Sequence, residues 1–311
     1  MASQRDVKDR ISSVKNIEKI TRAMEMVAAA RLRRAEQRIQ ALRPYASAIR
    51  RMTRQAADAA ENIPHLPILQ EHERVETVGI LVVTGDRGLA GAFNSQILRA
   101  GTRAANELEQ NGCSARFYAS GRRGASSLRF RRREAAREYV GFTDRPSYAD
   151  AREIAQDLMT DYVDGEVDRV DIFYNGFISA MSQVVRRETL LPLQRATVLE
   201  EDEDGSDADD GDRDESESSG DEGKRALVEY EPGPEEILRR LVPDYVEISI
   251  YRALLESTAS EHGARMTAMR NASENAGTLI EDLTLEMNRA RQAEITQEIM
   301  EVVAGAEGLA G

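Results

Sequence analysis

The chain has 311 residues, of which 41% are hydrophobic and 31% charged, yet only 5% are aromatic and none is Trp. This composition supplies few large core-filling side chains and favours long amphipathic helices over a compact globule. The net charge of -13 arises within residues 200–223, which hold 14 Asp and Glu against one Arg, so the rest of the chain is neutral and bulk charge indicates no class of partner. The single cysteine, Cys113, excludes an internal disulfide and a multi-cysteine metal site.

The chain carries no signal for membrane insertion or secretion. No apolar run approaches the roughly 18 residues that cross a bilayer, and the N-terminal MASQRDVKDR lacks the apolar region of a signal peptide. We therefore expect no direct membrane span and a location in, or facing, the cytoplasm.

Residues 1–60 are predicted to form one long helix. Residues 4–59 contain no Gly and a single Pro, Pro44, which should bend or interrupt the helix. At 1.5 Å per residue the helix would span roughly 80 Å. Apolar side chains recur every three or four residues in two successive runs, which indicates a narrow apolar seam. The first run is Val7, Ile11, Val14, Ile17, Ile20, Met24 and Val27, and the second is Leu32, Ala35, Ile39, Leu42, Ala46 and Ile49.

The same helix is basic. Residues 1–54 carry 14 Lys and Arg against five Asp and Glu, with a dense stretch, RLRRAEQR, at 31–38. Tyr45 is the only aromatic residue there, and the charges fall on several faces, so nucleic acid is a poor fit. A solvated surface or an acidic protein partner explains the pattern better.

Residues 75–195 alternate between strand and helix patterns. The continuous apolar run TVGILVV is typical of a strand covered on both faces. Strand, helix, strand, helix, strand indicates a Rossmann-like α/β domain with a mainly parallel sheet. The expected strands are 77–83, 115–120 and 167–177 with an edge strand at 187–193, and the expected helices are 92–111 and 148–164.

The loop TGDRGLAGAFN, residues 84–94, lies where a phosphate-binding loop would lie. Its glycines, Gly85, Gly88 and Gly91, are spaced GxxGxxG, which is not the dinucleotide pattern GxGxxG, and no P-loop lysine follows. A tight structural turn, with Asp86 and Arg87 bonded to nearby backbone, is therefore favoured over a nucleotide site. A nucleotide-dependent enzyme stays an alternative that requires this loop to bind phosphate.

No catalytic constellation is inferable. His65, His72 and His262 are scattered, and none has a carboxylate at the spacing of helical metal ligands. We therefore expect no catalytic residue, no metal and no cofactor.

Residues 200–223 contain no apolar side chain larger than Ala and cannot offset the entropy of ordering. We predict an acidic, disordered loop.

Residues 234–311 are predicted to hold the second long helix, clearest from Asp244 to about Gly305. Its length would be roughly 90 Å, and Gly263 and Gly277 each cost it about 1 kcal/mol relative to Ala. Two long helices with single apolar stripes can bury them against each other, so an antiparallel coiled coil is expected. The stripe comprises Ile248, Tyr251, Leu255, Met266, Met269, Ala272, Leu279, Leu283, Met287, Ala290, Ile299 and Val302.

The end of this helix is unusually polar. If the two helices align at the central domain, the C-terminal one is longer, and its tip has no partner within the chain. A lone helix end is weakly stable in water, so another protein should enclose it. A stand-alone coiled-coil scaffold is a further alternative.

Three stretches, in order, closely resemble the gamma subunits of bacterial F-type ATP synthases. They are ISSVKNIEKITRAMEMVAAARLRRAEQR (11–38), TGDRGLAGAFN (84–94) and ARMTAMRNASENAGTLIEDLTLEMNRARQAEITQEIMEVVAGAEGL (264–309). The resemblance implies a non-catalytic rotor whose terminal helices form a shaft inside a ring of three alpha and three beta subunits. It places the α/β domain beside the epsilon subunit and the membrane ring of c subunits. Proton flow would turn the shaft and drive the beta subunits through states of different nucleotide affinity.

The resemblance also implies contact residues. Arg291 and Gln292 match positions that hydrogen-bond a loop of the beta subunit, with Thr296 as a helper one turn further on. Val302 and Val303 match the apolar tip held in a bearing at the top of the ring.

The resemblance extends to positions outside the tip. Met24, in KITRAM, matches the position where the N-terminal helix nears beta, and Arg31, Arg33 and Arg34 would face solvent or an acidic segment of beta. Ala90 stands where the family commonly has Cys. The stretch 200–223 falls near the redox-regulated insert of chloroplast relatives but has no cysteine.

Overall fold

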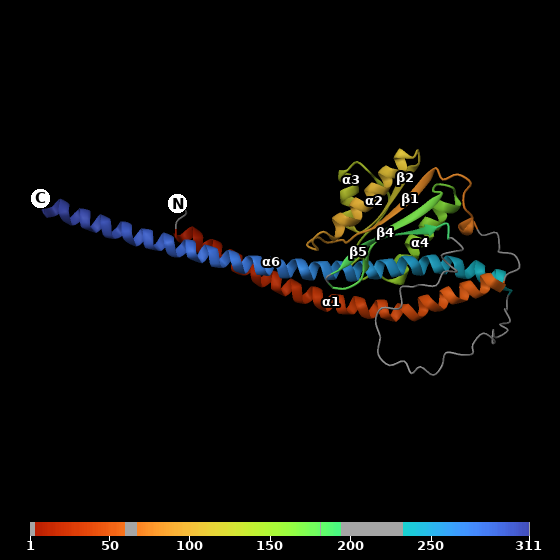
Figure 1. Cartoon of the computed structure of the whole chain (residues 1–311), viewed down its shortest axis with the longest axis horizontal. Coiled ribbons are helices and arrows are strands. Elements are labelled where there is room, and N and C mark those ends of the chain that lie inside the picture. The colour runs from red at the N-terminus through yellow and green to blue at the C-terminus, as the bar shows by residue number, and fades with distance from the viewer. Residues whose placement is uncertain (1–3, 60–66, 181, 194–232, 311) are drawn as a thin grey trace, which may run out of the picture.

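The computed structural model describes residues 4–59, 67–180, 182–193 and 233–310. The molecule is elongated: two long antiparallel helices run side by side, and an α/β domain sits against one part of them (Figure 1). The N-terminal helix α1 spans Gln4–Ala59 and the C-terminal helix α6 spans Pro234–Ala310. The predicted fold class, an antiparallel coiled coil with a Rossmann-like domain, is confirmed.

The contact seam of α1 follows a strict heptad. Buried or half-buried side chains alternate in steps of four and three along the whole helix, which is the spacing of a left-handed coiled coil. The fully buried members are Val7, Ile11, Thr21, Ala28, Leu32, Ala35, Ile49, Thr53 and Ala56.

The predicted seam was wrong in its middle. Ile17, Ile20 and Val27 are each more than half exposed, because they lie one position before the heptad and face outward on its flank. Thr21 and Ala28 take their places against α6. Small side chains let the two helices approach closely there, and the larger apolar residues remain beside the seam.

Proline does not end either helix. Pro44 lies inside α1 and Pro243 inside α6, which therefore begins at Pro234 rather than at Asp244. In Figure 1, α1 is continuous but changes direction in its C-terminal half. At 77 residues α6 is about 115 Å long, well beyond the expected length.

The α/β domain is built on a five-stranded sheet of order β3-β2-β1-β4-β5. Strands β1 to β4 are parallel, and β5 is an antiparallel edge strand. The strands are β1 Thr77–Val83, β2 Ser114–Ser120, β3 Ala135–Tyr139, β4 Arg169–Phe177 and β5 Gln183–Leu191.

Helices cover both faces of the sheet. Helices α2 (Phe93–Gln110) and α3 (Arg122–Phe130) pack on one face. Helix α4 (Tyr148–Val163), the short 3-10 helix η1 (Pro67–Leu69) and the first part of α6 pack on the other. The shaft helix is therefore a layer of the domain, so the two parts share one core.

The expected strands and helices are all present, but α3 and β3 were not predicted. The expected acidic loop, 200–223, lies outside the described residues. Within the described residues, no helix combines the length and apolar character that a membrane crossing needs.

Candidate functional site

The topology of the sheet defines the edge at which a ligand would bind. In doubly wound folds, ligands bind at the carboxyl edge of the strands where the strand order reverses, here between β1 and β4. The loop 84–94 leaves β1 at this point. Whether it is a nucleotide site depends on its backbone N–H groups and on the space in front of it.

Side chains of the domain already accept from two of those N–H groups. The N–H of Gly85 donates to Oδ1 of Asn94 at 2.8 Å, and the N–H of Asp86 donates to Oγ1 of Thr143 at 2.8 Å. The Asp86 carboxylate in turn accepts from the N–H groups of Arg122 and Gly141, both at 2.9 Å. Asp86 therefore ties the loop to neighbouring backbone, as predicted.

Arg87 was predicted to bond to backbone, and this prediction was wrong. Its side chain lies 3.6 Å from the Asp144 carboxylate, an ion pair rather than a bond to backbone.

Helix α6 fills the space in front of the loop. A Cβ built on Gly85 would lie 2.6 to 2.8 Å from the carboxylate of Glu261, which shows how closely α6 approaches the loop. One residue earlier, the hydroxyl of Ser260 donates to the carbonyl of Asn175 in β4 at 3.0 Å. A nucleotide phosphate would have to displace the shaft helix, so the arrangement argues against the nucleotide-dependent enzyme.

A buried polar cluster fixes α6 to the loop. Arg265 pairs with Glu261 one turn away and donates to the carbonyl of Gly88 at 3.3 Å. Its Nη1 lies 3.2 Å from Nδ1 of His262, which must accept because a guanidinium can only donate. All three side chains of α6 are buried.

Burial sets the protonation of this cluster. Burial and the Arg265 charge lower the pKa of His262 to about 4, so the imidazole is neutral near pH 7. Burial also raises the pKa of Glu261, although Arg265 opposes this shift. Within the cluster, the Arg265–Gly88 bond joins the shaft to the domain, and the Arg265–His262 bond requires a neutral His262.

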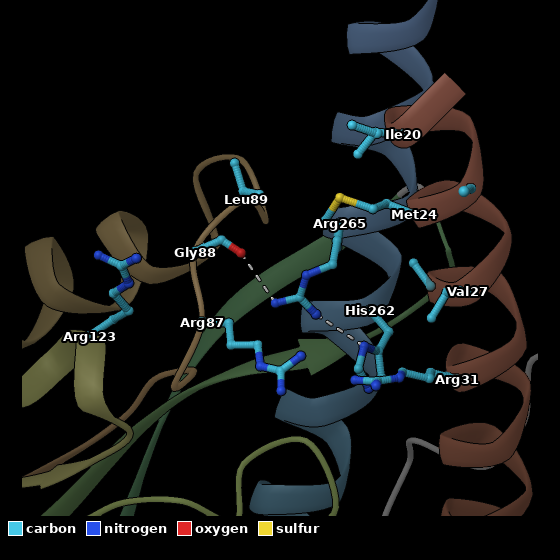
Figure 2. Close-up of a pocket in the computed structure, with 12 residues that line it drawn as sticks. Ile20, Met24, Val27, Arg31, Arg87, Gly88, Leu89, Arg123, His262 and Arg265 are labelled. Carbon is cyan, nitrogen blue, oxygen red and sulfur yellow. Dashed lines mark hydrogen bonds between the residues drawn. The ribbon is translucent and has the colours of Figure 1, made fainter. Parts of the chain in front are cut away.

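A cavity of about 550 Å³ opens between α1, the loop and α6. Figure 2 shows Met24 and Val27 of α1 facing Gly88 and Leu89 across it, with Arg265 and His262 on the α6 side. Leu89 is 64% exposed and adopts a positive φ of 63°. The cavity thus combines an apolar wall with cationic groups, which include Arg31, Arg87 and Arg123.

Within the described part of the chain, the tip of α6 lies beyond the part of α1 that packs with it. Val7 and Ile11 of α1 pack with Leu283, and Met287 is the last α6 residue in that cluster. Every described side chain from 291 to 304 is exposed, and Figure 1 shows α6 running past the start of α1. About 35 Å of helix projects.

The predicted tip residues share one side of this helix. At 100° per residue, Arg291, Gln292, Thr296, Val302 and Val303 fall within about 140° of the circumference. Ile295 and Ile299 lie within the same arc, whereas Glu294, Gln297 and Glu301 lie opposite. Val302 is 73% and Val303 51% exposed, and the Thr296 hydroxyl donates to the Gln292 carbonyl at 2.9 Å.

Met24 lies at a different height on the shaft from the tip residues. It is half-buried in the cavity beside Arg265, about 39 Å along α6 from Arg291. The candidate residues therefore form contact points at separate heights on the shaft.

The histidines do not assemble into a metal site. His72 pairs with Asp168, Nδ1 to Oδ1 2.6 Å, and His262 lies in the cluster above, whereas His65 falls outside the described residues. No group of three potential metal ligands occurs among the residues that the structure describes. The His72–Asp168 pair was not predicted, because the partners are 96 positions apart.

Sequence reasoning also missed the Arg265 cluster. Its signal was present: Glu261, His262 and Arg265 are polar residues within an apolar helix, and the first and last are spaced for an i, i+4 pair.

Comparisons with known proteins cover the whole chain. Residues 3–309 match the family described as ATP synthase. The chain is 44% identical to the ATP synthase gamma chain of Rubrobacter xylanophilus, covering 100% of this chain and 99% of that protein. It is 42% identical to the gamma chain of Streptomyces avermitilis, covering 99% and 97%.

Solved structures agree in fold. A chain from the central stalk and c-ring of Tetrahymena thermophila mitochondrial ATP synthase matches with a TM-score of 0.58 and 26% identity, covering 82% of this chain and 99% of that one. A chain of Euglena gracilis mitochondrial ATP synthase matches with a TM-score of 0.66 and 19% identity, covering 98% and 94%.

Proposed function

This chain belongs to the family of ATP synthase gamma chains, and from that premise we propose how its shaft couples rotation to ATP chemistry. It is the central-stalk rotor subunit of the complex and has no catalytic role of its own. One observation carries the proposal: α6 outruns α1 and exposes a one-sided arc of polar and apolar residues. Such a projecting helix needs a protein host.

The host of the tip is the ring of three alpha and three beta subunits. Arg291 and Gln292 donate hydrogen bonds to a loop of the beta subunit, and Thr296 supports them from the same side. Val302 and Val303, further along this arc, turn against the apolar bearing at the top of the ring. Their exposure supports these roles, because an apolar tip in water is unfavourable unless another protein covers it.

Met24 marks a second contact with beta. The cavity that it lines offers an apolar wall and arginines, among them Arg123, which makes no ion pair within the described residues. An acidic segment of beta with an apolar side chain complements both properties. Arg31, Arg33 and Arg34 extend the cationic surface on α1.

The foot of the rotor contacts the membrane part of the machine. The α/β domain lies beside the epsilon subunit and the c-ring, at the cytoplasmic face of the cell membrane, and proton flow through the ring turns it. The Arg265–Gly88 hydrogen bond fits a rotor, because it ties α6 to the loop 84–94 and so links the shaft to the foot.

The size of each contact suits a rotor. A hydrogen bond that involves a charged group contributes roughly 1.5–3 kcal/mol. A few such bonds bias one beta conformation over the others without stalling the next step.

The proposal is tested in a complex reconstituted by co-expression with alpha and beta subunits. Arg291→Ala with Gln292→Ala should leave assembly intact but lower ATP hydrolysis about tenfold or more, since each lost bond removes about 1 to 3 kcal/mol of coupling. Wild-type turnover in this double variant would refute the contact assignment.

A matched variant controls for general damage to the tip. Glu294→Ala with Gln297→Ala changes two exposed residues of the same turns on the opposite side of the helix. This variant should retain wild-type hydrolysis. An equal loss in both variants would show that helix stability, not the contact arc, is responsible.

A further inference from the structure

Helix α1 carries an arginine ridge on its outer side. The ridge consists of Arg33, Arg34, Arg43 and Arg51, all exposed. None of them occupies a seam position: helical geometry places Arg33, Arg34 and Arg51 on the side away from α6 and Arg43 on the flank of the seam. Between residues 31 and 54 the sequence has eight arginines and one acidic residue, Glu36.

The ridge lacks the acidic partners that many other arginines have. On the α/β domain, Arg116 pairs with Glu166 and Arg133 pairs with Glu109. No ion pair is formed by any ridge arginine within the described part of the chain. The like charges of the ridge therefore repel one another without internal compensation.

An acidic segment of the same chain is tethered beside the ridge. Residues 200–223 lie outside the described residues but carry a net charge of -13. They are joined to the fold at Leu193 and Gly233, and the first turns of α6 after Gly233 pack in the same core cluster as Ala56 of α1. The tether thus ends next to the C-terminal end of the ridge helix.

The covalent reach is sufficient. Gly223 lies ten positions before Gly233, and this stretch spans up to about 35 Å when extended. The distance along α1 from Ala56 to Arg33 is also about 35 Å. The more central acidic residues have longer tethers, so every arginine of the ridge is accessible.

We propose that the arginine ridge of α1 is the docking surface for the acidic segment 200–223 of the same chain. The contact is electrostatic and needs no fixed fold of the segment. Single exposed ion pairs are weak. Here the tether supplies an effective concentration in the order of millimolar, and many pairs exchange over the ridge, so the segment stays associated at low ionic strength.

This docking has a consequence that rests on the proposed function. Arg33 and Arg34 belong both to the ridge and to the surface that we assign to an acidic element of beta. The chain's own segment would then compete with beta for these residues, and neutralising the segment would change hydrolysis only in the assembled complex.

The docking itself is tested on the full chain alone, so its outcome does not depend on the ring. In a Cys113→Ser background, spin labels are placed at Gln40→Cys, an exposed position among the ridge arginines, and at Ser216→Cys within the segment. Electron–electron dipolar spectroscopy should give a distance distribution weighted towards short distances at low salt. The distribution should lengthen and broaden at high salt, because the Debye length falls from about 10 Å at 0.1 M to about 3 Å at 1 M.

Two sets of substitutions separate the ridge from charge in general. Replacing all four ridge arginines by Gln should lengthen the distance at low salt as much as high salt does. Replacing Arg99, Arg103, Arg131 and Arg132, four exposed arginines of the α/β domain, should leave it unchanged. Circular dichroism checks that both variants fold. Identical distributions in the parent and the ridge variant, or equal lengthening in both variants, would overturn the proposal.

Discussion

Arg265 has opposite electrostatic effects on two neighbouring side chains of α6. It compensates the charge of buried Glu261, and it disfavours a charge on His262, whose ring nitrogen accepts its hydrogen bond. Asp144, which attracts a proton to His262, and Arg31 of α1, which opposes one, complete the charged surroundings. A buried imidazole kept neutral in this way makes stability depend on pH.

We expect the free energy of unfolding to fall as pH drops from about 6.5 towards 4. The unfolded His262 binds a proton near its usual pKa of 6.5, whereas the folded one binds only near pH 4, so acid favours the unfolded chain in this window. The full contribution is about 3 kcal/mol. Urea unfolding at several pH values measures it.

A His262→Gln variant isolates this effect from other groups. The raised pKa of Glu261 acts in the opposite direction, because proton binding to the folded state favours folding as pH falls. The difference between parent and variant should therefore show the slope of His262 alone. Parallel pH profiles for the two proteins would contradict the assignment.

Gly85 makes a second residue-scale prediction. An added Cβ would meet the Glu261 carboxylate at under 3 Å, and the carboxylate cannot move freely because Arg265 holds it. Gly85→Ala should destabilise the chain by about 1–3 kcal/mol in urea unfolding. In a Glu261→Ala background the same change should cost much less. Equal costs in both backgrounds would show that α6 does not press on the loop.

At the scale of elements, periodicity predicted the two helices but not their true seam. Apolar character favoured Ile17, Ile20 and Val27, whereas the structure buries Thr21 and Ala28. Counting large apolar residues misses a close helix contact made by small ones. The strict seven-residue repeat was the better signal, because only that period keeps one side of a long helix on its partner.

The unpredicted elements have local reasons. β3 is short and its side chains alternate between half-buried and exposed, so AAREY resembles a polar loop in sequence. Helix α3, RRGASSLRF, has a glycine, Gly124, at its third position, which lowers its apparent helical propensity. A Cβ on that glycine would lie 2.6 Å from the Thr84 hydroxyl, so close packing on β1 requires it. Such tertiary requirements are not visible in a single sequence.

The candidate site likewise contains residues that the sequence indicated and others that only the structure revealed. The family resemblance pointed to Arg291, Gln292 and the apolar tip, which all lie on one side of the projecting helix. The His72–Asp168 pair and the cavity beside Met24 depend on residues far apart in the chain and needed the fold.

Two glycines of α6 that look equivalent in sequence should respond differently to alanine. Nothing lies within 4 Å of a Cβ on Gly277, whereas one on Gly263 would lie 3.0 Å from the Ala180 carbonyl oxygen. Gly277→Ala should stabilise the helix by about 0.5–1 kcal/mol, and Gly263→Ala should lose this gain to the clash. Thermal unfolding midpoints compare them, and equal upward shifts would contradict the crowding at Gly263.

At the scale of the whole molecule, folding and coupling use different parts of one helix. The first half of α6 belongs to the core of the α/β domain, and its middle part pairs with α1. Among the described residues beyond Ala290, every side chain is exposed. A rotor requires this division, because the part that grips the ring must stay free of its own fold.

Truncation separates these roles. A chain ending after Ala290 removes the projecting tip, whose described side chains are all exposed, so its unfolding midpoint should stay close to that of the full chain. A chain ending after Thr278 also removes Ile280, Leu283 and Met287 and leaves Val7 and Ile11 exposed, which should cost several kcal/mol. With alpha and beta subunits, the first truncation should already lower ATP hydrolysis although its fold is intact. If it lowered the unfolding midpoint as much as the second does, the tip would be part of the folding unit rather than a free contact surface.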